Sequence, residues 1–249
     1  MKKMSQFVEG IVAGKWRWAE GLYSLKVAAE IESFQAGQFT KLALDINGKV
    51  AERAYSFINA PGETPLEFYF IEVSDGLLTP RLAELEFGDA ILVASQATGF
   101  LTLSEVPDAR DLWLLSTGTG IAPFLSILKT EIPWQRFERI VLVHAVRYAY
   151  ELVYGESISD FAQQHGEQFR FVPFVSREET DFALRARIPA AIADGRLEAR
   201  VDVALTAKSS QVMLCGNPGM AHDTTKVLLE RGMKRNRRHD PGHITQESY

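Results

Sequence analysis

The feature that most constrains the fold is a set of four apolar runs in the second half of the sequence, each continuous rather than alternating. They are LWLLS (112–116), IVLVHAV (140–146), FRFVPFVS (169–176) and QVMLC (211–215), and segments of helical character separate them. Strands that are apolar on both faces are typical of a parallel sheet covered by helices. We therefore predict an α/β parallel-sheet, Rossmann-like domain that ends in a long helix from Pro218 to about Asn236.

The first half of the sequence follows a different pattern, in which short strands alternate with glycine, proline and asparagine turns. The expected strands are Phe7–Ala13, Leu22–Ala28, Phe39–Ile46, Arg53–Ile58, Leu66–Val73 and Ala90–Ser95, with one short helix over 79–85. This pattern predicts an antiparallel β-barrel. The change of pattern near Glu105–Asp111 predicts two domains, 1–104 and 105–249.

Composition excludes several classes of protein. The 249 residues carry a net charge of −5, whereas a general nucleic-acid binder needs a basic footprint. A single cysteine, Cys215, cannot form an intramolecular disulfide or a four-cysteine iron–sulfur cluster. The N-terminus lacks the apolar core of a signal peptide, and no apolar run approaches the ~20 residues that span a bilayer. We therefore expect a cytoplasmic protein with neither nucleic-acid nor membrane partners.

Residues suited to a nucleotide phosphate follow the apolar runs. Gly118 and Gly120 allow a tight strand-to-helix turn, and the next helix offers free N–H groups to a pyrophosphate. Arg147 and Arg177 each follow a strand, and Arg187 opens a helix. Arginine binds phosphate in a bidentate manner and replaces the acidic residue that binds the ribose of NAD, so the pattern favours NADP. The alternatives are a plain helix cap and solvated surface arginines.

In the first half, Arg53-Ala54-Tyr55-Ser56 lies in an expected strand, where Arg53 and Tyr55 share one face. The arginine could pair with a phosphate, and the tyrosine could stack on a planar ring. Taken alone, this segment favours the simpler interpretation, an ordinary exposed strand face.

Together, three motifs resemble those of the ferredoxin/flavodoxin–NADP⁺ reductase family, in its short bacterial branch. They are Arg53-Ala54-Tyr55-Ser56, Thr117-Gly118-Thr119-Gly120-Ile121-Ala122-Pro123 and Cys215-Gly216-Asn217-Pro218, in matching order and spacing. The resemblance implies an N-terminal FAD domain and a C-terminal NADP domain. It also implies hydride transfer from NADPH to flavin N5, followed by one-electron release to ferredoxin or flavodoxin.

The resemblance also implies which residues bind the cofactors. Arg53 would hold the FAD pyrophosphate, Tyr55 would stack on the isoalloxazine, and Ser56 would lie near N5. The other implied FAD contacts are Ala54, Tyr69, Leu77, Leu78, Thr79, Thr119 and Tyr249. The implied NADP contacts are Val146, Arg147, Ser176, Arg177, Arg187, Asn217, Pro218, Gly219 and Asp223.

Four residues match positions of the family near the reacting rings: Ser56, Cys215, Glu247 and Tyr249. Cys215 would pack beside the nicotinamide without forming a covalent bond, and Glu247 would belong to a proton path. Tyr249 would cover the flavin face where the nicotinamide arrives. From the residues alone, Cys215 could be a small core residue and Tyr249 a frayed end. Close bacterial members can carry a further tryptophan that stacks on the FAD adenine, and this sequence ends without it.

The implied carrier is acidic, so we expect a basic docking surface on a monomeric enzyme. Lys234, Arg235, Arg237 and Arg238 form a candidate cluster, and a solvated helix end is the alternative. The rival functions on the same scaffold are an NAD(P)H-dependent flavin reductase, an oxygenase reductase component and a non-catalytic FAD electron-transfer subunit. A fused iron–sulfur reductase would need more than one cysteine.

Overall fold

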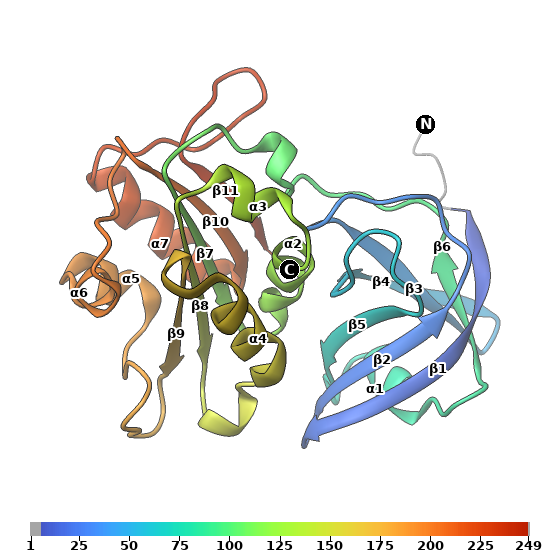
Figure 1. Ribbon diagram of the computed structural model, residues 1–249. Coiled ribbons are helices and arrows are strands. Elements are labelled where there is room, and N and C mark those ends of the chain that lie inside the picture. Colours follow the sequence, from blue (N-terminus) through green and yellow to red (C-terminus); the bar gives the residue numbers. More distant parts are fainter. Residues whose placement is uncertain (1–5, 249) are drawn as a thin grey trace.

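The computed structural model describes residues 6–248, which form two sheets lying side by side (Figure 1). An antiparallel sheet of six strands occupies the N-terminal half, and a parallel sheet of five strands occupies the C-terminal half. The two-domain architecture predicted from the sequence is thereby confirmed. Tyr249 lies outside the described residues. Within residues 6–248, no helix has the length and apolar character needed to cross a membrane.

The N-terminal sheet has the strand order β4-β3-β6-β1-β2-β5. Its strands are β1 (Phe7–Ala19), β2 (Leu22–Ala28), β3 (Phe39–Ile46), β4 (Lys49–Ser56), β5 (Leu66–Ile71) and β6 (Ala90–Ala94). The bridge between Phe57 and Phe68 joins the ends of the two outer strands, which closes the sheet into a barrel. A short helix, α1 (Thr79–Glu84), lies at its lower end in Figure 1.

Strand β4 begins four residues earlier than the sequence suggested. Asn47 and Gly48 both have positive φ, and Ile46 pairs with Lys49, so these two residues form a tight hairpin turn. Asn-Gly is the preferred sequence for such a turn because both positions require positive φ. Strand β1 also continues past Ala13 to Ala19, because it remains paired with β2.

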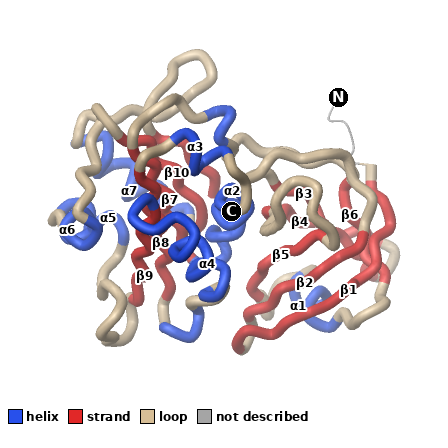
Figure 2. Tube along the Cα trace, in the orientation of Figure 1, coloured by secondary structure: helices blue, strands red, loops and turns tan. Residues whose placement is uncertain are grey.

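The C-terminal sheet has the strand order β11-β10-β7-β8-β9, with every neighbouring pair parallel. Its strands are β7 (Asp111–Thr117), β8 (Arg139–Val146), β9 (Phe169–Val175), β10 (Ser210–Gly216) and β11 (Ile244–Ser248). The helices are α2 (Ala122–Leu128), α3 (Ile132–Arg136), α4 (Gly155–His165), α5 (Ile188–Ala193), α6 (Arg196–Val201) and α7 (Pro218–Glu230). Figure 2 shows these helices flanking the sheet.

Alternate side chains of each strand pack on opposite faces of this sheet. Leu112 and Leu114 join the core under α2 and α4, whereas Trp113 and Leu115 join the core under α5, α6 and α7. All four side chains are fully buried, which explains the continuous apolar run.

Two features of the C-terminal region differ from the sequence expectation. Helix α7 ends at Glu230 rather than near Asn236, and Gly232 follows with a φ of 78°, a conformation that stops a helix. The chain then returns as β11, which the sequence did not predict. Its sequence is ITQES, which is too polar to be recognised as a strand from the pattern, although it pairs with β10.

The two halves share one core and one polar bridge. Leu22, Ile58 and Tyr69 from the barrel pack in the same cluster as the α2 and α4 face of the parallel sheet. Tyr154, in a left-handed conformation just before α4, donates from its hydroxyl to Glu67 on β5 at 2.9 Å and also contacts Ser24. The barrel and the sheet are therefore held in a defined relative position.

Candidate functional site

A cleft of about 530 Å³ lies between the barrel and the carboxyl edge of the parallel sheet. Leu22, Tyr69 and Ile71 line it from the barrel, and residues that follow β7, β8, β9 and β10 line it from the sheet. This is the edge where open parallel sheets bind ligands, and the volume suits a nucleotide-sized molecule.

The cleft brings together many of the residues singled out in the sequence. Those that line it are Tyr69, Thr119, Val146, Arg147, Ser176, Arg177, Arg187, Asn217, Gly219 and Asp223. The others do not line it: Arg53, Ala54, Tyr55, Ser56, Leu77, Leu78, Thr79, Cys215, Pro218 and Glu247. All of the first set except Tyr69 comes from the sheet side of the cleft, and most of the second belongs to the barrel.

Three glycines bring the β7 and β10 turns into contact. A Cβ on Gly120 would lie 2.5 Å from the Cys215 carbonyl oxygen, and one on Gly216 would lie 2.2 Å from Thr117 Oγ1. Gly120 is thus required for packing between the two turns. Gly118 has a φ of 52° and supplies the sharp bend.

His144 supports the bend at Gly118 from inside the sheet. It is fully buried in β8, and burial lowers its pKa to about 4, so the ring is neutral at physiological pH. Its Nε2 lies 2.9 Å from the Gly118 carbonyl oxygen. Because a carbonyl only accepts, Nε2 carries the proton and donates to it. Sequence analysis missed this residue, although a histidine inside an otherwise apolar strand was a visible signal.

The ends of β8 and β9 place the arginines at one wall of the cleft. The backbone N–H of Arg177 donates to the Arg147 carbonyl at 2.9 Å, which ties the two strand ends together. The guanidinium groups of Arg177 and Arg187 have no hydrogen-bond or ion-pair partner within residues 6–248, whereas Arg147 is paired with Glu151. The hydrogen bonds to Glu151 raise the pKa of Arg147 further above its usual value, so its guanidinium remains cationic.

The side chains of Asn217 and Ser176 form hydrogen bonds with the backbone around the cleft. Asn217 is the N-cap of α7, where its Oδ1 accepts from the N–H groups of Gly219 and Met220. The Ser176 hydroxyl donates to the Val146 carbonyl at 3.2 Å. Asp223 is exposed on α7, where its carboxylate lies 3.1 Å from His222 Nδ1. Asn217 and Ser176 thus shape the cleft through the backbone that they hold, whereas Asp223 lines it from the helix surface.

On the barrel, Tyr55 carries the clearest signal of a missing partner. Its hydroxyl is buried and has no hydrogen-bond partner within residues 6–248, and burial raises its pKa to about 12. Buried polar groups nearly always have a partner, so the position fits a bound group that supplies one. Arg53 is exposed, and within residues 6–248 its guanidinium hydrogen-bonds only to the neighbouring Glu52 carbonyl. An exposed guanidinium beside a buried orphan hydroxyl is compatible with a phosphate-bearing aromatic cofactor.

The Leu77–Thr79 segment fits the sequence expectation less closely. Leu78 is 3% exposed and belongs to the barrel core, and the Thr79 hydroxyl is bonded to the backbone of Val73. Only Leu77, at 62% exposed, presents its side chain to solvent. Contacts from Leu78 and Thr79 to a ligand would therefore run through their backbone.

Cys215 and Glu247 lie opposite each other in the register of β10 and β11. Cys215 is 2% exposed, and burial raises the pKa of its thiol well above the usual range, so it is a neutral group at physiological pH. Burial also raises the pKa of Glu247 to about 7. Its Oε2 is buried without a hydrogen-bond partner in the described chain. The pair forms a weakly solvated spot where β10 ends, with a neutral thiol beside a carboxyl that titrates near neutral pH.

The basic cluster of residues 234–238 lies in the loop between α7 and β11, so the helix-end interpretation is wrong. Arg238 forms an ion pair with Glu105 at 2.8 Å and lies over the exposed ring of Phe100. Lys234 lies 3.4 Å from Asp240. Part of the cluster's charge is therefore already balanced.

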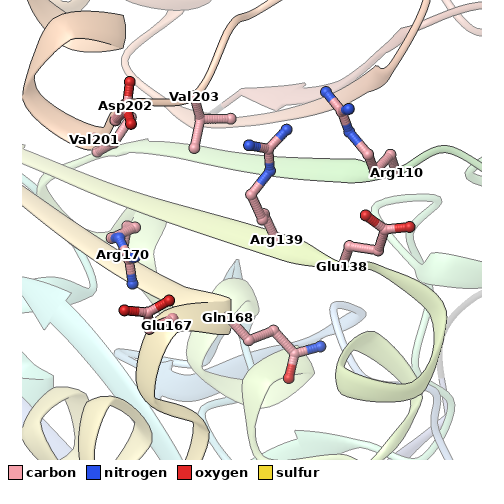
Figure 3. Close-up of a pocket in the computed structure, with 9 residues that line it drawn as sticks. All are labelled: Arg110, Glu138, Arg139, Glu167, Gln168, Arg170, Val201, Asp202 and Val203. Atoms are coloured by element: carbon pink, nitrogen blue, oxygen red, sulfur yellow. The ribbon is translucent and has the colours of Figure 1, made fainter.

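A second hollow, of about 460 Å³, lies at the opposite edge of the parallel sheet, where the strands begin (Figure 3). Its arginines have partners: Arg110 and Arg139 both bind the fully buried carboxylate of Asp111. Glu138 and Asp202 add negative charge to the same wall. The third arginine, Arg170, donates to the carbonyl oxygens of Gly166 and Phe169, so all three guanidinium groups of this hollow have partners, unlike those of Arg177 and Arg187 in the described cleft.

The barrel, the parallel sheet and the cleft between them define a two-domain nicotinamide-nucleotide oxidoreductase. Residues 114–226 match the family model described as the oxidoreductase NAD-binding domain. The chain is 45% identical over 247 residues to the flavodoxin/ferredoxin–NADP reductase of Escherichia coli (strain K12), covering 99% of this chain and 100% of that one. It is 34% identical to the ferredoxin–NADP reductase of Pseudomonas aeruginosa, covering 93% and 92%.

A solved structure gives the same result. A ferredoxin NADP⁺ reductase from Neisseria gonorrhoeae, determined with bound FAD and NADP, superimposes with a TM-score of 0.93 at 34% identity. The match covers 98% of this chain and 99% of that one. The chain belongs to the flavodoxin/ferredoxin–NADP reductase family, which confirms the resemblance seen in the sequence.

Proposed function

We propose that this protein is an FAD-dependent reductase that moves electrons between NADPH and ferredoxin or flavodoxin. The observation that carries the proposal is the cleft shared by the two halves, with three cations along its sheet wall and an orphan tyrosine hydroxyl in the adjoining barrel. The names of the relatives and the FAD and NADP bound to the similar structure support the same activity.

On the sheet side, the residues of this chain bind and orient NADPH. Arg177 and Arg187 have free guanidinium groups suited to the 2′-phosphate, and Arg147 stands beside them. The Thr117–Thr119 turn and the Asn217–Gly219 turn approach the pyrophosphate, with Val146, Ser176, Pro218 and Asp223 around them. His144 holds the first of these turns in place from inside the sheet.

On the barrel side, Arg53 binds the FAD pyrophosphate and Tyr55 stacks on the flavin, with Ala54 beside them. Tyr69, Thr119 and the Leu77–Thr79 backbone complete the contacts. When bound, FAD supplies the conversion of a two-electron hydride transfer into one-electron steps. Tyr69 also packs edge-on against Tyr154, which links the flavin side to the interface between the halves.

Four groups act near the reacting rings in this proposal. Cys215 packs as a neutral side chain that orients the nicotinamide, and the Ser56 hydroxyl stands near the flavin edge. Glu247, with its pKa of about 7, can hold or release a proton at neutral pH. Tyr249 covers the flavin face, but lies outside the described residues.

The same proposal includes the domain boundaries, the oligomeric state, the cellular location and the docking surface. Residues 1–104 form the FAD domain and residues 105–249 the NADP domain. The enzyme works as a cytoplasmic monomer whose one cysteine stays reduced. An acidic carrier docks at the basic loop of residues 234–238, where exposed charge makes binding weaken as salt rises.

The visible spectrum of the anaerobic, purified protein tests the proposal. NADPH should bleach the flavin bands at concentrations where NADH does little, and adding ferredoxin or flavodoxin should restore them. A protein that holds FAD but does not respond to NADPH would contradict the reductase function. Equal responses to NADPH and NADH would contradict only the role of the arginines in selecting NADP, and not the reductase function.

A further inference from the structure

Glu151 has a buried carboxylate, and most of its hydrogen bonds are accepted from a single residue, Arg147. The residue is 6% exposed, in the turn that follows β8. Its Oε1 accepts from Arg147 Nε at 3.0 Å and from Nη2 at 2.6 Å. Its Oε2 accepts from the backbone N–H of Arg147 at 2.7 Å and from that of Tyr148 at 3.3 Å. The carboxylate thus fixes both the backbone and the side chain of Arg147.

This arrangement leaves one edge of the Arg147 guanidinium available. Nε and Nη2 face Glu151, while Nη1 has no hydrogen-bond partner within the described chain. Arg147 and Glu151 both line the cleft, and the Arg147 side chain is 58% exposed. A guanidinium binds phosphate through two parallel N–H bonds, and the Nη1–Nη2 edge still offers such a pair.

The neighbouring arginines show what Glu151 changes. The guanidinium groups of Arg177 and Arg187 have no partner in residues 6–248, so each side chain must give up freedom when it binds a phosphate. Arg147 has already given up that freedom in the free protein. Because Arg147 and its two N–H groups neutralise the carboxylate, Glu151 does not present an uncompensated negative charge to the ligand.

We propose that Glu151 is a positioning residue for NADP selectivity, which holds Arg147 with its free edge toward the 2′-phosphate of the nucleotide. The inference rests on the proposed NADPH-binding function and deepens it. In this proposal Glu151 acts through Arg147, so its effect should be confined to ligands that carry the 2′-phosphate.

Calorimetric binding of 2′-phospho-AMP and of AMP tests this, with the holoenzyme and the Glu151→Gln variant. Glutamine can still accept from the backbone N–H groups, but its amide NH₂ cannot accept from the guanidinium. We expect binding of 2′-phospho-AMP to weaken about three- to tenfold, the loss from releasing one ordered side chain. AMP binding should not change. The KM for NADPH should rise by the same factor at constant kcat, with the KM for NADH unchanged.

Glu178→Gln is the matched control. The Glu178 carboxylate accepts from the Ala149 N–H in the same turn and forms no ion pair with an arginine within residues 6–248, so this variant should bind both ligands normally. In an Arg147→Ala background, Glu151→Gln should cause no further loss, because the residue that it positions is gone. That comparison also decides the question if the single variant folds poorly, since the double variant lacks the unpaired arginine.

Three outcomes would overturn the proposal. Equal weakening of AMP and 2′-phospho-AMP would mean that Glu151 only maintains the turn. Unchanged or tighter binding of 2′-phospho-AMP by Glu151→Gln would mean that the carboxylate does not position Arg147 productively. If the unaltered holoenzyme failed to prefer 2′-phospho-AMP over AMP, the NADP site itself would be wrong, and the role of Glu151 with it.

Discussion

The parallel-sheet half and the barrel half build their parts of the cleft region by different means. In the sheet, strands β7, β8, β9 and β10 are parallel and all end at one edge. The topology alone therefore brings together the residues that follow them. In the barrel the strands run in alternate directions, so the candidate flavin residues come from the end of β4, the interior of β5 and the loop before α1.

The two halves also differ in how their polar groups are satisfied. On the sheet side, Arg147 has Glu151, the Asn217 side chain caps α7, and His144 holds Gly118. On the barrel side, the Tyr55 hydroxyl is buried without a partner in the described chain. Arg147, Asn217 and His144 Nε2 thus have partners within the protein, although His144 Nδ1 and Glu247 Oε2 in the sheet half also lack one in the described chain. For the Tyr55 hydroxyl we expect a bound ligand to supply the partner.

The largest effect on stability is expected from disrupting the contact between the β7 and β10 turns at Gly216. In Gly216→Ala the new Cβ would meet Thr117 Oγ1 at 2.2 Å, at a φ of 133°. We expect a loss of about 3 kcal/mol or more in the free energy of unfolding, measured with urea, because both the clash and the backbone conformation are unfavourable.

Gly155→Ala is the matched control for that variant. Gly155 begins α4, has no positive φ, and nothing lies within 4 Å of the position of its Cβ. Its substitution should change the free energy of unfolding by no more than about 0.5 kcal/mol. If Gly216→Ala were equally harmless, the contact between the β7 and β10 turns would not organise the sheet wall.

The same difference explains how much the sequence could predict. The parallel sheet and its strand-end residues were predictable, because buried strands are continuous and apolar and because topology gathers their ends. The barrel class was predictable from its turns, and only the family motif pointed to the flavin role of Arg53 and Tyr55.

What escaped sequence analysis depends on contacts that local pattern does not encode. Tyr154 meets Glu67 across 87 positions of the chain, and β11 pairs with β10 despite a polar sequence. Glu151 follows Arg147 by four residues, a common surface spacing, and only the conformation of the turn makes it an orienting group. These residues support the site rather than form it, so no motif marks them.

Glu247 lies at the border between the two halves. A Cβ on Gly99, in the barrel half, would be 3.4 Å from the Glu247 Oε1. Burial raises the pKa of this carboxyl from 4.5 to about 7. Between these values the folded state keeps a proton that the unfolded state releases. The free energy of unfolding should therefore fall as pH rises from about 4.5 to 7, by on the order of 2–3 kcal/mol.

Urea titrations of the FAD-free protein at several pH values measure this slope. Glu247→Gln cannot titrate, so its stability should lack that component of the pH dependence. A variant with the same pH profile as the unaltered protein would show that Glu247 is as well solvated as a surface carboxylate.

The smallest effect, and the most direct test of the difference between the halves, concerns Tyr55→Phe. In the FAD-free protein the hydroxyl is buried without a described partner, so its removal should stabilise the fold by about 1 kcal/mol. Once FAD supplies the partner, the same substitution should weaken FAD binding, by about fivefold. Tyr154→Phe is the control, because its hydroxyl already has Glu67 and Ser24 as partners, and it should destabilise the protein with or without FAD. If both variants behaved alike, the Tyr55 hydroxyl would be satisfied within the chain, and the flavin side would be as self-contained as the sheet wall.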